Sequence, residues 1–412
     1  MAAFDPEIFD REVLQSNGID TAFGVPDSSL SGILSYFSAT KPTSEHVVLA
    51  NEGAAVGLAV GYYLATRKIA LAYVQNSGLA NALNPLQSIA AKEVFGIPML
   101  LMIGWRGKPG EKDEPQHALI GPRLLDNLEA NGFPYEEIRG NLADAKATVS
   151  RLIQIAEQKK TPVALIVPRN TFAEYKTVKD SASSEESSSS LPRALDFVKA
   201  TRWLSPMGSG NLPLSRELVL RHSMDFIDAN DTTVSSLGGN SRELYMIHKE
   251  KGGNLGQNFF CIGGMGHSFA LAQGLAVGFA QESRRIWCLD GDGSFIMHLG
   301  NNAVLAGLSR HSNVVHVVIY NGVYSSTGSQ PLMIQPGSFL DLAEGLPYQQ
   351  KIFVDNVFGL RSALSSATGG TLIVAVTNDR FSSKLPRPVE TSTELKYLFL
   401  ENIQRLSNGI TA

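Results

Sequence analysis

The stretch WCLDGDGSFIMHLGNN, residues 287–302, places two carboxylates among glycines directly after an apolar run that is typical of a buried strand. Acidic side chains at the end of a strand often hold a divalent cation. A second strand-like run, VVHVVIYNG (314–322), follows one helical segment later. We therefore expect the two strands to be neighbours in a parallel sheet, with Asp292 and Asn321 brought together at their carboxyl ends.

This pair of side chains predicts a magnesium site. An Asp carboxylate, an Asn amide oxygen and a nearby carbonyl suit Mg²⁺, and so sparse a set leaves positions for phosphate oxygens and water. The neighbouring glycines allow the backbone to approach such phosphates. An EF-hand loop is disfavoured because its sixth position is Phe295 and its twelfth is Asn301. A simple tight turn is the other alternative, and the Asn-Gly after the second strand argues against it.

The rest of the chain shows the same alternation of β-rich runs and helical patterns. Such a rhythm predicts βαβ units and parallel sheets whose strands are covered on both faces. The fold class is therefore α/β, with two doubly wound parallel-sheet domains. We expect the first domain over residues 1–178, a Ser-rich linker over 179–205 around DSASSEESSSSLP, and the second domain over 206–412. The predicted strands are 46–50, 69–74, 97–104, 162–168, 232–238, 285–291, 314–322 and 371–377.

Composition limits the classes of function. The 412 residues carry a net charge of −4, which argues against a nucleic-acid partner because such proteins normally carry a basic stripe. The two cysteines, Cys261 and Cys288, lie in apolar runs and are expected to be buried thiols. No apolar run approaches a membrane span and no secretory segment follows the acidic start, so we expect a cytoplasmic protein.

The GDGS turn followed by Asn-Gly resembles the Mg²⁺-thiamine diphosphate motif of thiamine-dependent enzymes. By that resemblance Asp292 and Asn321 bind the metal through their side chains and Val323 through its carbonyl. The family usually has two consecutive Asn residues here, whereas this chain has Tyr320-Asn321. The resemblance implies thiamine diphosphate and Mg²⁺ as cofactors.

A second part of the resemblance lies in the first half, in HVVLANEGAAVGLAVGYYLAT (46–66). Thiamine enzymes need a carboxylic acid against the pyrimidine ring, and Glu52 stands at the expected junction of strand and helix. A buried carboxyl that retains its proton can hydrogen-bond the ring nitrogen and promote the imino form. On the alternative interpretation Glu52 only stabilises a helix N-terminus.

Further residues match the cofactor-binding part of the family. Met265 in GGMG matches the bulky apolar residue that supports the bent cofactor, although an ordinary core Met is equally expected. The loop GGNSRELY can offer amides and polar side chains to a diphosphate, although helix capping explains them as well. The expected cofactor-binding residues are Gly238, Asn240, Ser241, Gly264, Met265, Gly291, Gly293 and Ser294.

Several segments resemble phosphonopyruvate decarboxylases, with sulfopyruvate decarboxylases as close relatives. They are 23–34, 51–66, 73–86, 104–121 and 321–331. Many relatives carry a third, central domain, which the Ser-rich linker replaces here. The resemblance implies decarboxylation of phosphonopyruvate in phosphonate biosynthesis, giving phosphonoacetaldehyde and CO₂.

Such a reaction needs groups that bind an anionic tail and supply a proton. Histidine is the residue type that commonly shuttles protons near neutral pH, so His117 is expected to do so or to pair with the anionic tail. Asp27 is expected to orient His117 or to act as the acid. A solvated loop histidine and an Asx-turn after Pro26 are the alternatives. The expected substrate-binding residues are Ser28, Arg106, Ser325, Ser326 and Thr327, which as loop charges and turn hydroxyls also have ordinary explanations.

The resemblance also implies a homodimer or larger homo-oligomer, in which Glu52 of one subunit faces the diphosphate site of another. Two other functions stay open. One is carboligation, or decarboxylation of sulfopyruvate or another 2-oxo acid. The other is a catalytically silent module that binds a diphosphate, for which Glu52 would be unnecessary.

Overall fold

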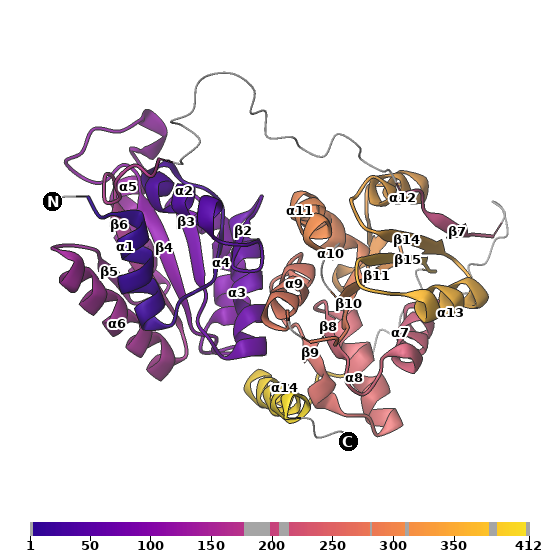
Figure 1. Ribbon diagram of the computed structural model, residues 1–412. Coiled ribbons are helices and arrows are strands. Elements are labelled where there is room, and N and C mark those ends of the chain that lie inside the picture. Colours follow the sequence, from indigo (N-terminus) through magenta and orange to yellow (C-terminus); the bar gives the residue numbers. More distant parts are fainter. Residues whose placement is uncertain are drawn as a thin grey trace. The chain divides into compact units, whose positions relative to one another are not determined.

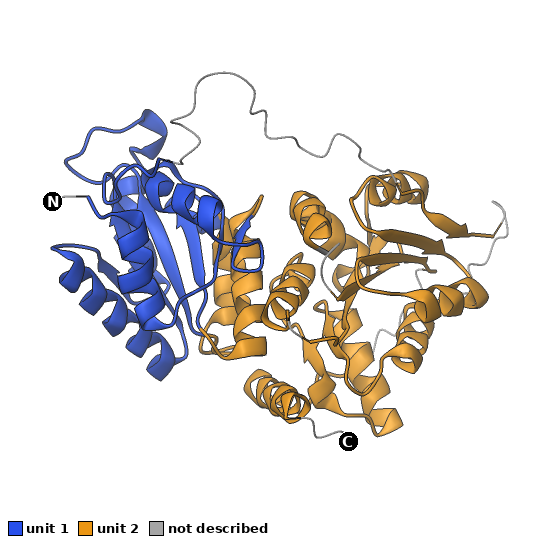
Figure 2. Cartoon of the chain, viewed as in Figure 1, with its two compact units in different colours: residues 1–48, 69–80, 98–197 blue, residues 49–68, 81–97, 198–412 orange. Residues whose placement is uncertain are grey.

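The computed structural model describes residues 3–176, 198–205, 214–280, 282–309, 313–378 and 385–408. The chain divides into two compact units (Figure 2). Unit 1 comprises residues 1–48, 69–80 and 98–197, and unit 2 comprises residues 49–68, 81–97 and 198–412. The centre of the predicted linker, residues 180–192, lies outside the described residues.

Unit 1 is built on a six-stranded parallel sheet with the order β2-β1-β3-β4-β6-β5 (Figure 1). Its strands are β1 (Ala22–Gly24), β2 (His46–Val48), β3 (Leu71–Gln75), β4 (Met99–Trp105), β5 (Tyr135–Glu137) and β6 (Pro162–Pro168). Its helices are α1 (Pro6–Phe9), α2 (Ser31–Thr40), α5 (Ile120–Ala130) and α6 (Leu142–Lys159), while α4 (Leu79–Pro85) crosses the boundary between the units along the chain.

The sequence explains why these elements form. Every residue of β4 is buried, as expected for a central strand of a parallel sheet. Helix α6 begins at a capping box in which Asn141 and Asp144 bond each other's backbone N–H, and it ends at Lys160 in the left-handed conformation. The apolar side of α6 packs with α1, α2 and the strands into one core.

Unit 2 is built on a seven-stranded parallel sheet with the order β7-β14-β15-β11-β10-β8-β9. Its strands are β7 (Thr201–Trp203), β8 (Thr232–Ser235), β9 (Asn258–Phe260), β10 (Ile286–Gly291), β11 (Val314–Tyr320), β14 (Gln350–Val354) and β15 (Thr371–Val376), and β12 (Val323–Tyr324) and β13 (Gln330–Pro331) form a small antiparallel ribbon. Its helices are α3 (Glu52–Thr66), α7 (Arg216–Phe226), α8 (Gly239–Lys251), α9 (Ser268–Gly278), α10 (Asp292–Met297), α11 (Leu299–Ser309), α12 (Pro336–Glu344), α13 (Val357–Ser366) and α14 (Ser392–Ser407).

The predicted fold class is confirmed, because both sheets are parallel and carry α-helical connections. One difference concerns the predicted linker, residues 179–205, whose end contains β7. Backbone pairing with β14 draws this short strand into the sheet. Both cysteines are buried free thiols, as expected. No helix among the described residues has the length and apolar character needed to cross a membrane.

Helices α3 and α9 lie side by side within unit 2 with their backbones in near contact. A Cβ added at Gly61 would lie 2.1 Å from the carbonyl oxygen of Leu271, and one added at Gly274 would lie 2.1 Å from that of Leu58. Such positions accept only glycine without movement of the backbone. Gly53 faces His267, Gly57 faces Ala270 and Gly278 faces Ala65, so contacts advance in the same direction along both helices, which are therefore parallel.

Candidate active site

The GDG turn after β10 joins the ends of two neighbouring strands. Strands β10 and β11 are paired in parallel. The buried Asp292 carboxylate accepts the N–H of Gly293 through Oδ1, at 2.7 Å. Its Oδ2 accepts the N–H groups of Asn321 and Gly322, at 3.0 and 2.7 Å. The structure thus brings Asp292 and Asn321 together as the sequence predicts, and burial raises the pKa of Asp292 despite these three hydrogen bonds.

The side chain of Asn321 is held by its own loop. Its Nδ2 donates to the Ser325 hydroxyl at 2.8 Å, and its Oδ1 accepts the N–H of Val323 at 3.1 Å. Asp292, Asn321 and Val323 all line one pocket. A carboxylate, an amide oxygen and a main-chain carbonyl are the hard ligands that Mg²⁺ takes, so these residues fit the predicted metal.

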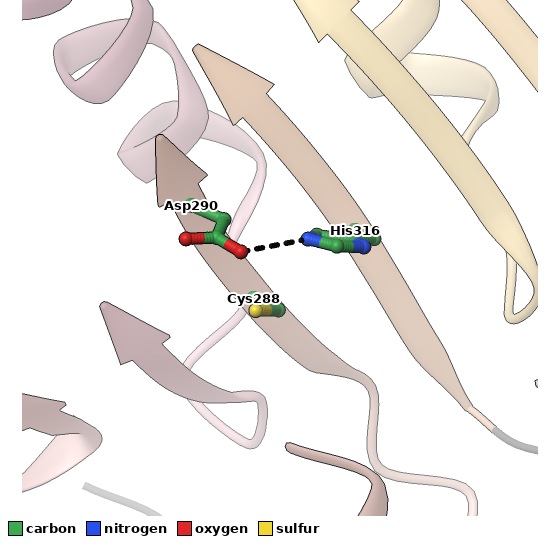
Figure 3. A group of neighbouring side chains, drawn as sticks. All are labelled: Cys288, Asp290 and His316. Atoms are coloured by element: carbon green, nitrogen blue, oxygen red, sulfur yellow. Dashed lines mark hydrogen bonds and ion pairs between the residues drawn. The ribbon is translucent and has the colours of Figure 1, made fainter. Parts of the chain in front are cut away.

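The other carboxylate of the motif, Asp290, is buried and faces His316 (Figure 3). Its Oδ1 accepts the N–H of Gly291 at 2.9 Å, and its Oδ2 lies 3.4 Å from His316 Nε2. His316 Nδ1 lies 2.7 Å from the Tyr348 hydroxyl. Cys288 completes a buried group whose ligand atoms lie within 4.8 Å of one another. Burial raises the pKa of the Cys288 thiol, and the hydrogen bond from Gly291 makes Asp290 a support of the turn.

The pocket at these strand ends belongs entirely to unit 2. It contains most of the residues that the sequence assigns to metal, cofactor and substrate. Ser241 and Gly264 are absent from its lining, and six lining residues were not predicted: Arg216, Ser236, Leu237, Gly239, Ile319 and Tyr324. The predicted residues that line it are Gly238, Asn240, Met265, Gly291, Asp292, Gly293, Ser294, Asn321, Val323, Ser325, Ser326 and Thr327.

The loop between β8 and α8 forms one wall of this pocket. Gly238 has a φ of 84°, a conformation that favours glycine. Asn240 Nδ2 donates to the Ser236 hydroxyl at 3.0 Å. The Ser241 hydroxyl instead bonds the carbonyls of Ser236 and Cys261, at 2.9 and 3.1 Å. Ser241 therefore differs from its expected place, because its side chain turns toward main-chain acceptors in the protein.

The GGMG segment contributes to the pocket through Met265. Gly293 leaves room for its neighbours, since a Cβ there would lie 2.6 Å from Tyr324 Cε1 and 3.3 Å from Met265 Cε. Gly264 has a packing role: its N–H donates to the Ser88 hydroxyl at 2.8 Å, and a Cβ would lie 2.1 Å from Ile89 Cδ1.

The hydroxyl-bearing turn after Asn321 forms another part of the wall. Thr327 Oγ1 lies 2.7 Å from Gln330 Oε1, so this hydroxyl is engaged within its own turn. Ser326 Oγ would lie 3.2 Å from a Cβ added at Gly238, which places Ser326 beside the β8–α8 loop.

Glu52 is the first residue of α3, following the N-cap Asn51. Its Oε2 accepts the amide of Asn81 at 2.8 Å. The side chain is only half-buried, whereas the sequence interpretation expects a buried carboxyl. The described residues of the single chain leave it partly exposed at the first position of α3. A Cβ added to the next residue, Gly53, would lie 2.5 Å from His267 Nε2, two residues after Met265.

A second polar cluster lies at the carboxyl ends of β1, β3 and β4 in unit 1. Asp27 is buried and accepts the N–H of Ser29 at 3.1 Å and the amide of Gln75 at 2.9 Å. The first bond is the Asx-turn that the sequence offered as an alternative. Burial is the largest cause of the raised pKa of Asp27, so its carboxyl is easier to protonate than an exposed one.

Arg106 is fixed in this cluster. It makes a bidentate contact with Asp113, from Nε to Oδ2 at 2.9 Å and from Nη2 to Oδ1 at 2.6 Å. Its Nη1 donates to the Ser28 hydroxyl at 2.7 Å. The guanidinium holds the pKa of Asp113 well below its usual range. Arg106 is thus an ordered cation rather than a solvated loop charge.

His117 is buried in the same unit, and its Nδ1 has no hydrogen-bond partner. Among the described residues no hydrogen bond joins it to Asp27, so the structure does not show the orienting contact that the sequence suggested. Gly107, with a φ of 68°, allows the His117 carbonyl to approach the chain closely, since a Cβ would lie 2.2 Å from it.

Comparison with known proteins agrees with this arrangement. The N-terminal TPP binding domain of thiamine pyrophosphate enzymes matches residues 11–128, and the C-terminal TPP binding domain matches residues 243–355. A sulfopyruvate decarboxylase subunit alpha of Methanococcus maripaludis is 34% identical over 124 residues, which are 30% of this chain and 71% of the relative. The chain belongs to the thiamine pyrophosphate enzyme family.

Two further relatives of this thiamine pyrophosphate enzyme match along most of their length. A phosphonopyruvate decarboxylase of Streptomyces viridochromogenes is 28% identical over 93% of this chain and 91% of the relative. A sulfopyruvate decarboxylase of Methanosarcina acetivorans is 28% identical over 80% of this chain and 79% of the relative. With these relatives and both cofactor-binding domains, the chain is a thiamine diphosphate-dependent decarboxylase, a carboxy-lyase.

Solved structures support the fold. A protein of Mycobacterium smegmatis described as a thiamin diphosphate-dependent enzyme superposes with a TM-score of 0.65, 15% identity, and coverage of 91% of this chain and 100% of that chain. Benzoylformate decarboxylase from Polynucleobacter necessarius gives a TM-score of 0.64, 14% identity, and coverage of 93% and 100%.

Proposed function

We propose that this enzyme decarboxylates phosphonopyruvate to phosphonoacetaldehyde and CO₂, using thiamine diphosphate and Mg²⁺. The carrying observation is the pocket of unit 2, in which Asp292, Asn321 and Val323 supply oxygen ligands beside the glycine-rich β8–α8 loop. The likeness to phosphonopyruvate decarboxylases, over 93% of this chain, supports the choice of substrate.

In this proposal the residues of unit 2 hold the cofactor. Asp292 and Asn321 bind the metal by side chains, and Val323 by its carbonyl. Gly238, Asn240, Gly291, Gly293 and Ser294 surround the diphosphate, and Met265 supports the thiazolium ring. When bound, thiamine diphosphate supplies a carbon nucleophile that accepts the electron pair left by CO₂.

Protons are handled by carboxyl and imidazole groups. Glu52 holds a proton at the pyrimidine nitrogen, which requires that the bound cofactor complete the burial that the free chain lacks. Asp27, whose pKa is raised by burial, and His117 are the proposed acid groups for the final protonation. Arg106 and Ser28, with Ser325, Ser326 and Thr327, are the proposed partners of the anionic substrate.

We propose that the enzyme is cytoplasmic and that it forms a homodimer or larger homo-oligomer. In the single chain, α3 already packs on α9 in the unit that contains the pocket. Whether Glu52 serves the pocket of its own chain or of a neighbouring subunit stays a prediction. The test is to mix an inactive Glu52→Gln chain with an inactive Asp292→Asn chain. Activity returns only if an active site combines Glu52 of one subunit with Asp292 of another.

The substrate is tested by incubating the purified enzyme, thiamine diphosphate and Mg²⁺ with phosphonopyruvate, sulfopyruvate or pyruvate, and by measuring CO₂. We expect kcat/KM to be highest for phosphonopyruvate. A preference for sulfopyruvate would instead support the activity named in several relatives. CO₂ from pyruvate alone would reject an anionic-tail substrate. Unchanged turnover in Glu52→Gln would reject the proposed activation of the cofactor.

A further inference from the structure

Arg216 is a buried cation in the pocket that no sequence motif indicated. It is the first residue of α7, after the N-cap Ser215, and only 8% of its surface is exposed. Its Nε donates to Glu243 Oε2 on α8 at 2.5 Å. Among the described residues that line the pocket, Arg216 alone carries a positive charge.

The ion pair leaves part of the guanidinium unused. Glu243 engages Nε, whereas the buried Nη2 has no hydrogen-bond partner. A buried, unsatisfied donor of this kind is costly, and structures rarely retain one without a ligand or water. Glu243 therefore fixes the plane of the guanidinium, and free N–H donors remain to bind an anion.

The neighbouring glycines bring this guanidinium close to the β8–α8 loop. A Cβ added at Gly239 would lie 2.1 Å from Arg216 Nη1 and 2.6 Å from its Cζ. Any side chain at position 239 would displace the guanidinium. Gly239 is also the first residue of α8, a thirteen-residue helix whose N-terminal amides favour negative charge.

We propose that Arg216 binds a phosphoryl oxygen of the diphosphate in this pocket. This inference rests on the proposed function, which places thiamine diphosphate there. A diphosphate carries more negative charge than one Mg²⁺ neutralises, and Arg216 supplies a fixed positive charge at the helix terminus. The phosphonate of the substrate offers the same chemistry, but the position of Arg216 against Gly239 favours the diphosphate.

A purely structural ion pair is the competing explanation, and the chain offers a matched control for it. Arg221 and Glu250 join the same two helices, with Nη2 and Oε2 2.6 Å apart. Their side chains are 33% and 51% exposed, and neither lines the pocket. A structural role would make Arg216→Gln and Arg221→Gln differ only in stability.

The test is a calorimetric titration of wild type, Arg216→Gln and Arg221→Gln with thiamine diphosphate, thiamine and inorganic pyrophosphate, all with Mg²⁺. A lost hydrogen bond to a charged group corresponds to about 10- to 100-fold weaker binding. We expect that loss for thiamine diphosphate and pyrophosphate in Arg216→Gln, with unchanged binding of thiamine. Arg221→Gln should bind all three as wild type does. The double variant Arg216→Gln/Glu243→Gln, which leaves no unpaired buried carboxylate, gives the same comparison if the single variant unfolds.

The outcomes separate the two proposals. If Arg216→Gln binds thiamine diphosphate normally but its KM for phosphonopyruvate rises tenfold or more, Arg216 binds the substrate and the proposed contact with the diphosphate is overturned. Equal losses for all three ligands, or no loss in affinity or KM, would overturn the inference. If wild type binds pyrophosphate through Arg216 but not thiamine diphosphate, the inference stands and the proposed function fails. If wild type binds neither, both fail.

Discussion

The two polar clusters at the strand ends differ in how their charges are satisfied. In unit 1, Arg106 is already paired with Asp113, and Asp27 with Gln75. In unit 2, Asp292 is held by main-chain N–H groups, and Arg216 keeps an unpaired nitrogen. Loops that follow parallel strands thus give two kinds of site. The first is a closed network suited to tuning proton affinity, and the second is an open cradle suited to a charged ligand.

The largest expected effect comes from removing the predicted metal ligand Asp292 from the unit 2 cluster. Asp292→Asn removes the charge that attracts the metal, so we expect loss of Mg²⁺ and thiamine diphosphate binding and a fall in kcat/KM of about 10³-fold or more. Calorimetry and CO₂ release measure the two effects. Asp341→Asn, at a 76% exposed carboxylate in the same unit, is the control and should resemble wild type. Near-normal Mg²⁺ affinity in Asp292→Asn would exclude Asp292 as the ligand.

The next effect concerns unit 1. Asp27→Asn can keep the Asx-turn to Ser29 while it removes the acid, so kcat should fall about 10²-fold with cofactor affinity unchanged. Asp144→Asn, at an exposed helix cap in the same unit, controls for general effects on the fold. The separation of the two clusters into binding and proton transfer would be wrong if cofactor affinity fell together with kcat.

A smaller effect is expected for Arg106→Lys. Lysine cannot reproduce the two-nitrogen grip on Asp113, so the cation loses its fixed position. We expect KM for phosphonopyruvate to rise about tenfold, the size of one lost charged contact, with little change for pyruvate. Arg139→Lys, whose side chain is 76% exposed, is the control. An equal rise in KM for both substrates would show that Arg106 does not bind the anionic tail of the substrate.

The smallest effect concerns stability and compares one histidine in each unit. Burial lowers the pKa of His46 and of His248 from 6.5 to about 4. Between these values the unfolded chain binds more protons than the folded one, so stability present above pH 6.5 is lost as the pH falls toward 4. Each histidine contributes at most about 3 kcal/mol to that loss. His46→Gln and His248→Gln should each flatten the pH dependence of thermal unfolding. An unchanged slope would mean that folding does not lower the pKa of that histidine.

Sequence patterns predicted the parts of the fold that depend on neighbouring residues in the chain. The long apolar runs became β4, β6, β10, β11 and β15, and the strand-end rule brought Asp292 to Asn321. Strands β1, β5, β7 and β9 were missed, and each has only three residues, too few for a pattern to show. β14 was missed as well, although four of its five residues are buried.

Sequence patterns likewise predicted only part of the candidate site. Arg216 was missed because its meaning depends on the packing of α7 against α8, which brings Glu243 to it across 27 positions of the chain. Ser241 was assigned to the pocket because a polar residue near a helix start signals either a cap or a ligand, and pattern alone does not fix where a hydroxyl points.

The glycine-lined contact of α3 with α9 also fixes the position of each helix along the other. With main chain against main chain at Gly61 and Gly274, neither helix can slide without a collision. A shift by one helical turn would move the start of α3 by about 5.4 Å, the pitch of the helix. The position of Glu52 thus depends on Gly61, about two and a half turns further along α3, and on Gly274 of α9. A substitution there would misalign the carboxyl without touching any ligand.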